Sequence, residues 1–391
     1  MYLNLKTYIL ILMGILVPIC SVLSPLFPFL IKGGFIFFWM IFFPLAVFSI
    51  KNIQGLSFML LTTLVLLLQL YGLQMDYFQK YFNIFISLFT MLYVFASHPR
   101  IDLDSMNKIA IGLGFGALFI NIITIIAMYF VSTGLIDLMQ LRLIFNTPDD
   151  IGLFRFALGN PIHVPFLITI CTILGVKFLK SNWLIFFLIS MNLITVVISQ
   201  SRGVFLITFF HLLFLFSKSG LLSRIIFSSI SIFFFIYFYE IFSGVSSSLV
   251  ARLAGEDLGS AETRAQYFAL IYENFDVVKL IFGGGLLSSQ LLILETLGEL
   301  QTVEASIIEM IYELGIIATI LFLLPLFLKM INIGLVKNIP IYFYLILGQI
   351  LFLLPVTTTF GLIFTLIIFM LNIYENDRNS RVTSVGLLQK Y

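Results

Sequence analysis

The sequence predicts an all-α, polytopic integral membrane protein with about twelve transmembrane helices. Of its 391 residues 61% are hydrophobic and only 10% are charged, and the mean hydropathy is +1.12. A soluble domain could not bury so much apolar surface, whereas helices in a bilayer expose it to lipid. Apolar runs recur along the chain, each near the ~20 residues that a spanning helix needs. One long hydrophilic stretch, 240–303, is set among them.

The apolar runs give the expected helices in order. They cover 7–24, 33–50, 53–72, 80–97, 108–131, 161–179, 183–200, 203–217, 224–243 and 303–328. The last run, 341–373, is too long for one span, and the segment 354–361 with its proline and glycine interrupts it midway. We therefore expect two short helices or a re-entrant hairpin there, in a single membrane domain covering 1–391.

The distribution of charge predicts the orientation. With the N-terminus in the cytoplasm, thirteen of the twenty-one basic residues and only four of the nineteen acidic residues lie inside. The loops 132–160 and 240–303 then lie on the outer side, and the tail 374–391 is cytoplasmic. Cys20 and Cys171 both fall in apolar runs, so we expect no disulfide.

Several common catalytic motifs are absent from the sequence. There is no Walker loop, no H-E-x-x-H, no C-x-x-C and no G-x-S-x-G, which argues against ATP-driven transport and against zinc or serine hydrolysis. The three histidines are scattered along the chain, so no metal site is expected. His211 lies inside an apolar run and reads as a packed histidine.

Two polar clusters flank the sixth to eighth runs. The first holds Arg155, Asn160 and His163, and Asn160 with the following proline is also an ordinary helix start. Arg155 lies six residues before a span, where a lipid-linked phosphate would reside. The second is the connection 199–203, which holds Arg202 at the bilayer boundary. Arg202 can bind a phosphate through two parallel hydrogen bonds, or reach to lipid headgroups.

The third cluster lies in the hydrophilic stretch. Arg264 is followed by two aromatic residues, an amphipathic segment and the glycines 283–285. These glycines can turn backbone N–H groups toward an anion, or simply let the chain turn sharply. A solvated helix would also explain Arg264.

The fourth cluster opens the tenth run. Glu304 and Gly315 share one helix face, while Glu309 and Glu313 stack on another. Glu304 can be a first-turn carboxylate favoured by the helix dipole. Glu313 lies ~13 Å further along the helix, where a carboxylate is costly unless it faces a wet cavity or an arginine.

These four clusters, in this order from Arg155 to Ile317, resemble the O-antigen ligase and O-antigen polymerase superfamily of bacterial envelope enzymes. The shared elements are R-x-x-x-G-N-P, S-R-G, an arginine followed by aromatics and then G-x-G, and a helix start ending in L-G-I-I. Ligases of this family carry a histidine eleven residues before the glycine of the last element, and this chain has Glu304 there. That difference favours the polymerase branch. The resemblance implies a GT-C-like architecture.

The resemblance also implies a function, a location and a set of site residues. Undecaprenyl-diphosphate-linked oligosaccharide repeat units would be both donor and acceptor, joined at the outer face of the bacterial cytoplasmic (inner) membrane without metal or cofactor. Arginines suit the stabilisation of a departing diphosphate, and a carboxylate suits deprotonation of the acceptor hydroxyl. The expected catalytic residues are Glu304, Arg202 and Arg264, and the expected substrate-binding residues are Arg155, Asn160, His163, Arg252, Gly283 and Gly285.

The same resemblance and charge pattern indicate partners and the functions that compete with polymerisation. Besides the lipid-linked glycan and the bilayer, a chain-length regulator protein is a candidate partner, and no nucleic acid is expected. A ligase that transfers glycan to lipid A-core differs by its acceptor, and Glu304 argues against it. A lipid-linked oligosaccharide flippase should carry its charged residues on central helices, and the charged stretch 240–303 argues against that.

Overall fold

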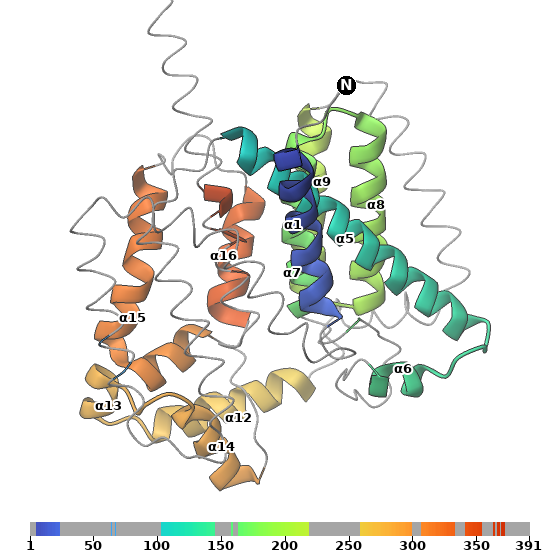
Figure 1. Ribbon diagram of the computed structural model, residues 1–391. Coiled ribbons are helices and arrows are strands. Elements are labelled where there is room, and N and C mark those ends of the chain that lie inside the picture. Colours follow the sequence, from blue (N-terminus) through green and yellow to red (C-terminus); the bar gives the residue numbers. More distant parts are fainter. Residues whose placement is uncertain are drawn as a thin grey trace, which may run out of the picture. The chain divides into compact units, whose positions relative to one another are not determined.

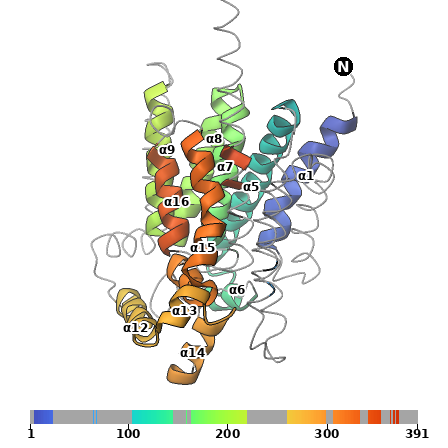
Figure 2. The ribbon, with the colours of Figure 1, turned by 90° about the vertical axis from the view of Figure 1, so that its left-hand side faces the viewer.

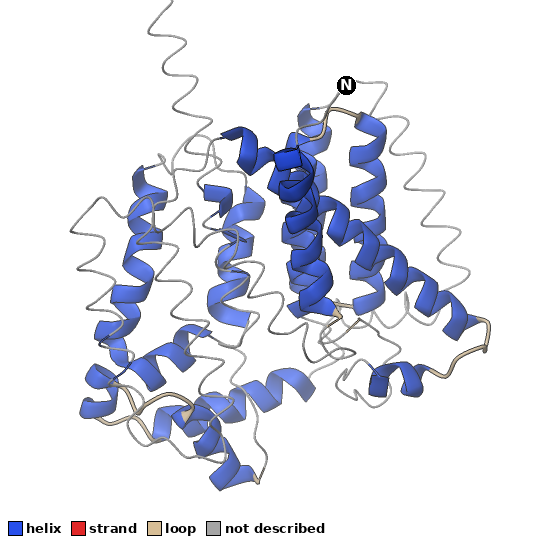
Figure 3. Ribbon diagram, in the orientation of Figure 1, coloured by secondary structure: helices blue, strands red, loops and turns tan. Residues whose placement is uncertain are grey.

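The structure is a computed structural model that describes residues 5–23, 64, 67, 103–144, 158, 163–218, 259–298, 306–332, 341–353, 363, 366–367 and 369–371. In these residues all regular structure is helical, which confirms the predicted all-α class (Figure 3). The predicted runs 33–50, 80–97 and 224–243, nearly all of 53–72 and the turn 354–361 lie outside the described residues.

Seven described helices fall on predicted apolar runs (Figure 1). They are α1 (Leu5–Val22), α5 (Leu103–Ser132), α7 (His163–Phe178), α8 (Asn182–Ser199), α9 (Arg202–Lys218), α15 (Ser306–Asn332) and α16 (Ile341–Leu353). Three segments in the described part, Asp104–Ser132, Asn182–Ser199 and Ile307–Leu324, are long and apolar enough to cross a membrane. This is compatible with an all-α membrane protein, and the total of twelve spans stays a prediction.

The chain divides into two compact units. The first comprises Met1–Ile41, Asp104–Asp257 and Pro340–Ile346, and the second comprises Phe42–Leu103, Leu258–Ile339 and Leu347–Tyr391.

Glycines bring α5 close to its two neighbours in the first unit. A Cβ atom on Gly112 would lie 2.2 Å from the carbonyl oxygen of Ile11 in α1, and one on Gly175 of α7 would lie 2.5 Å from the Cα of Gly114. Small residues at such crossings let helix backbones approach closely, which is the main way that helices associate without a hydrophobic driving force. The short helix α6 (Leu138–Ile144) follows α5.

A buried polar triad joins the middles of α7, α8 and α9. The side-chain amide of Asn192 donates to the hydroxyls of Thr169 at 3.0 Å and of Thr208 at 3.4 Å. Because short connections join these three consecutive helices, they alternate in direction. The start of α7 and the start of α9 therefore lie at the same end of this layer.

The described part of the hydrophilic stretch 240–303 is folded. In the second unit α12 (Gly259–Glu273), α13 (Val277–Phe282) and α14 (Ser288–Leu297) gather at the N-terminal end of α15 (Figures 1 and 2). A small core joins α12, α14 and α15 and consists of Ile271, Ile293 and Tyr312, one residue from each helix. Six partly buried side chains pack against it, namely Tyr267, Phe268, Leu270, Phe275, Leu292 and Ile308. We call α12, α13 and α14 together the α12–α14 assembly.

Candidate functional site

The glycine loop between α13 and α14 docks on a break in α15. Gly315 has φ 81° and ψ 163°, so the helix is interrupted there. In an uninterrupted helix the carbonyls of Tyr312 and Glu313 would accept from amides four residues later. Here they accept from the N–H groups of Gly284 at 2.8 Å and Gly285 at 3.0 Å. The loop thus satisfies the carbonyls that the break releases, and it joins two of the four sequence clusters into one structure.

The amides of the three glycines all have partners within the protein. Besides the two bonds to α15, the Gly283 N–H donates to the carbonyl of Lys279 at 2.8 Å and closes α13. This arrangement matches the sharp turn that the sequence left open as an alternative. Diphosphate binding by Gly283 and Gly285 stays a prediction, and it would require these hydrogen bonds to break.

Glu313 caps the N-terminus of α14. Its side chain is 2% exposed, and it accepts a hydrogen bond of 2.5 Å from the Ser289 hydroxyl. The backbone of Leu287 and of Ser289 also hydrogen-bonds to it. The N-cap position of α14 is Leu287, which has no side-chain acceptor and makes no cap hydrogen bond. A carboxylate from α15 therefore fills the role that Ser, Thr, Asp or Asn usually plays at this position.

Glu309 holds the same turn of α14 from one helical turn earlier. It is 0% exposed, and it accepts from the Nε2 of Gln290 at 3.3 Å. A buried charged group is costly unless hydrogen bonds compensate it. The sequence indicated that a carboxylate at this depth is costly unless it faces a wet cavity or an arginine; the described partners of Glu313 are a helix N-terminus and a hydroxyl. This contact could not be predicted from the sequence, because α14 has no Ser, Thr, Asp or Asn at its N-cap to mark the start of the helix.

The start of α13 is held by an N-cap and by contacts with the Tyr312 ring. The carboxylate of Asp276 accepts from the Lys279 N–H at 2.7 Å and caps α13. The Lys279 ammonium lies 5.7 Å from the centre of the Tyr312 ring and donates to the Asn274 carbonyl at 3.3 Å. The Phe275 ring meets Tyr312 edge-on at 5.1 Å. The loop is therefore anchored at both ends on the first half of α15.

The residues predicted as catalytic fall in different parts of the chain. Arg264 lies on α12, whose backbone is described there, and the aromatic residues that follow it, Tyr267 and Phe268, pack into the shared core. Glu304 lies two residues before the first residue of α15 and outside the described residues. Of the predicted binding residues, Arg155, Asn160 and Arg252 also lie outside them.

His163 and Arg202 belong to the first unit and open neighbouring helices. His163 is the first residue of α7 and is 7% exposed, and Arg202 is the first residue of α9. Each lies six residues before a threonine of the polar triad, so both stand at one end of the layer, ~9 Å from the triad along their helices. Gln200, with φ 53°, makes the left-handed turn that ends α8 just before Arg202.

Metal-ligating side chains do not cluster in the part of the chain that the structure describes. No group of three or more His, Cys, Asp or Glu residues could hold an ion there. Cys20 and Cys171 are both buried free thiols. The polar groups that meet at the described site are carboxyl groups, amides and a hydroxyl.

Comparison of the chain with protein-family models, with curated protein sequences and with solved structures finds no match.

Proposed function

We propose that the protein is a glycosyltransferase of the outer face of the bacterial inner membrane. It polymerises oligosaccharide repeat units that are linked to undecaprenyl diphosphate into O-antigen or a similar surface polysaccharide. The proposal includes twelve spans, cytoplasmic termini and an outer position for the stretch 240–303. A chain-length regulator protein is a candidate partner.

One structural observation supports the proposal most directly. Phe268 of α12 and Ile308 of α15 both pack against the core of Ile271, Ile293 and Tyr312. Arg264 lies four residues before Phe268 on the same helix, and Glu304 lies four residues before Ile308 in the sequence. Arg264 is therefore about one helical turn, or ~6 Å of rise, from a side chain that packs against this core. We propose that Glu304 approaches the same core from the start of α15, so that its carboxylate and the Arg264 guanidinium share one reaction centre.

The proposed reaction needs these two kinds of group. A hydroxyl at the non-reducing end of the acceptor unit attacks the anomeric carbon of the donor glycan. A new glycosidic bond forms, the bond to the diphosphate oxygen breaks, and undecaprenyl diphosphate leaves with the electron pair. Glu304 takes the proton of the hydroxyl as general base.

Arginines supply the other part of the chemistry. Negative charge gathers on the departing diphosphate, and preorganised guanidinium groups stabilise it in a poorly solvated site. We assign this role to Arg264 and Arg202 as catalytic residues. Arg155, Arg252, Asn160 and His163 are assigned to binding the diphosphate or the sugars. The energy for transfer is stored in the diphosphate linkage, so no nucleotide is required.

A deletion strain tests the proposal against its two competitors. Loss of a polymerase leaves a single repeat unit attached to lipid A-core, because ligation still proceeds. Loss of a ligase or a flippase leaves bare core. A ladder of lipopolysaccharide on a gel distinguishes these outcomes, and expression of the gene from a plasmid must restore the long chains. Bare core, or an unchanged ladder, would contradict the proposal.

A further inference from the structure

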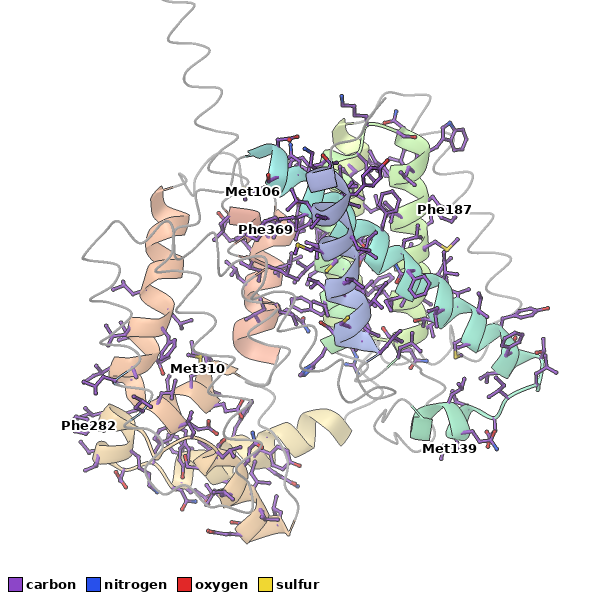
Figure 4. The ribbon with its side chains drawn as sticks, viewed as in Figure 1. Met106, Met139, Phe187, Phe282, Met310 and Phe369 are labelled. Carbon is purple, nitrogen blue, oxygen red and sulfur yellow. The ribbon has the colours of Figure 1, made fainter. Side chains whose placement is uncertain are left out.

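The short helix α13 exposes an unusual amount of apolar side chain. It has six residues, Val277 to Phe282, no acidic residue in its first turn and no buried residue. Val277 is 71% exposed, Val278 66% and Phe282 64%. We call these three residues the α13 patch. Phe282 projects from the outside of α13 (Figure 4).

The backbone of α13 at Phe282 meets α15 where an exposed apolar stripe on α15 begins. Gly315 is so close to α13 that a Cβ atom on it would lie 2.6 Å from the carbonyl carbon of Phe282. Immediately beyond this crossing α15 presents four exposed aliphatic side chains, Ile316, Ile317, Ile320 and Leu324. They belong to the segment Ile307–Leu324, which is apolar enough to cross a membrane. An exposed apolar stripe on such a helix is the surface that lipid covers.

Gly315 separates a part of α15 that carries charged residues from a part that carries none until Lys329. Glu309 and Glu313 lie before Gly315 and are hydrogen-bonded to α14. After Gly315 the first charged residue is Lys329, and α15 continues to Asn332. The charge-free part of α15 from Gly315 to Leu328 is ~20 Å long at ~1.5 Å per residue, and a lysine that follows such a segment can extend its side chain from the ~30 Å hydrocarbon core to the headgroups. The charge-free part of α15 thus begins at Gly315.

We propose that the surface of the hydrocarbon core meets this unit at Gly315, with α13 lying in the membrane interface. The α13 patch then contacts lipid, and the α12–α14 assembly stands above it in the headgroup region and water. The single charge of α13, on Lys279, is directed to the Tyr312 ring and the Asn274 carbonyl. With this cation held against the protein, the exposed face of α13 is apolar, as is the face that an interfacial helix turns to lipid.

A second copy of the chain is a poorer occupant of this surface. A stable protein interface buries about 800 Å² on each partner, whereas a helix of six residues is only ~9 Å long. The lipid assignment does not depend on the glycan chemistry, because it rests on exposure and on the length of α15.

Site-directed spin labelling of the full chain in liposomes tests the inference. Cys20→Ala and Cys171→Ala give a background without thiols, and labels are attached at Val278→Cys and at Phe282→Cys. Ile320→Cys serves as the reference for lipid, and Thr296→Cys, an exposed position on α14, as the reference for water. Collision rates are measured with oxygen, which concentrates in lipid, and with a water-soluble nickel chelate.

We expect the labels at 278 and 282 to collide more often with oxygen than with nickel, as at 320, and the label at 296 to show the reverse. The two α13 labels should report a shallower depth than the label at 320. Nickel collisions as frequent as at 296 would place α13 in water. Low collision rates with both reagents would show that protein covers the patch. Either result would overturn the inference.

Discussion

Gly283 and Gly315 cross each other in the same rare backbone conformation. Their dihedral angles are φ 85°, ψ 163° and φ 81°, ψ 163°, a region that is open essentially only to glycine. A Cβ atom on Gly283 would lie 2.3 Å from the carbonyl oxygen of Glu313, and one on Gly315 would lie 2.4 Å from that of Ile281. Both obstacles are backbone atoms, which cannot move aside cheaply. This crossing fixes α13 and the start of α14 on α15.

Gly315→Ala should therefore strongly destabilise the protein. The substitution combines a strained φ with a clash against the backbone, and strain of this kind alone costs about 1–3 kcal/mol. We expect a lower thermal unfolding temperature in detergent and increased proteolysis within 259–298. The rate at which a protease cleaves within 259–298, followed by gel electrophoresis, measures the change.

Two other glycines separate the cost of backbone strain from the cost of the steric clash. Gly298 has φ 76° but open space around it, so Gly298→Ala should show only the cost of strain. Gly348 lies inside α16 with no atom near its missing Cβ and no positive φ. Gly348→Ala should leave stability unchanged or raise it by up to about 1 kcal/mol. Equal behaviour of all three variants would show that the crossing does not matter.

Glu313→Gln should loosen α14 although it preserves side-chain size. The Ser289 hydroxyl and two backbone groups at the start of α14 hydrogen-bond to the Glu313 carboxyl, and an amide offers them one oxygen instead of two. Ser289→Ala removes a single buried hydrogen bond, which typically contributes about 0.5–1.5 kcal/mol. We expect a larger loss from Glu313→Gln and non-additive effects in the double variant. Hydrogen exchange of the amides in 288–291 reports the loss of the cap.

Glu295 is the matched control for that experiment. It is an exposed acidic residue on the same helix α14, so Glu295→Gln should change stability by less than about 0.5 kcal/mol. If Glu313→Gln exchanged its amides as slowly as Glu295→Gln, the capping role of Glu313 would be wrong.

The sequence predicted the seven described helices that fall on apolar runs, because runs of bilayer length are a strong local signal. The helices α6, α12, α13 and α14 lie in stretches that were predicted as loops. It also identified Gly283 and Gly315 as parts of two motifs. It could not predict that the two glycines cross, because their contact depends on how α13 packs and not on a repeat in the sequence. The partner of Glu313 was missed for a similar reason. Helical periodicity gives the face on which a carboxylate lies, but not the helix end that meets that face.

Cysteine labelling in whole cells tests the predicted orientation. Leu135 and Tyr272 are highly exposed and lie in or beside the two predicted outer loops, and Asp104 and Lys180 are exposed and belong to the predicted cytoplasmic side. Cysteines at 135 and 272 should react with a membrane-impermeant reagent in intact cells. Those at 104 and 180 should react only after permeabilisation. Labelling of 272 from the cytoplasmic side alone would remove the outer-face reaction from consideration.

Arg202→Lys and Arg264→Lys should each lose most polymerisation activity. Lys keeps the charge, but its ammonium cannot reproduce the planar pair of hydrogen bonds that a guanidinium makes with a phosphate. The length distribution of the surface polysaccharide measures the effect, with protein level checked by immunoblot. The control is Lys180→Arg, an exposed position away from the predicted site, which should keep full-length polymer. Full-length polymer from both arginine variants would reduce Arg202 and Arg264 to membrane anchors.

Polymer synthesis by the purified protein tests the central claim most directly. The wild-type chain in liposomes receives undecaprenyl-diphosphate-linked repeat units alone, and the products are separated by gel electrophoresis. We expect a ladder of longer lipid-linked glycans from the wild type and from Glu295→Gln. Glu304→Gln should leave single units, because loss of a general base lowers the rate ~10²–10⁴-fold. A wild-type protein that makes no ladder would contradict the proposed polymerase, and a normal ladder from Glu304→Gln would contradict the role of Glu304 as its base.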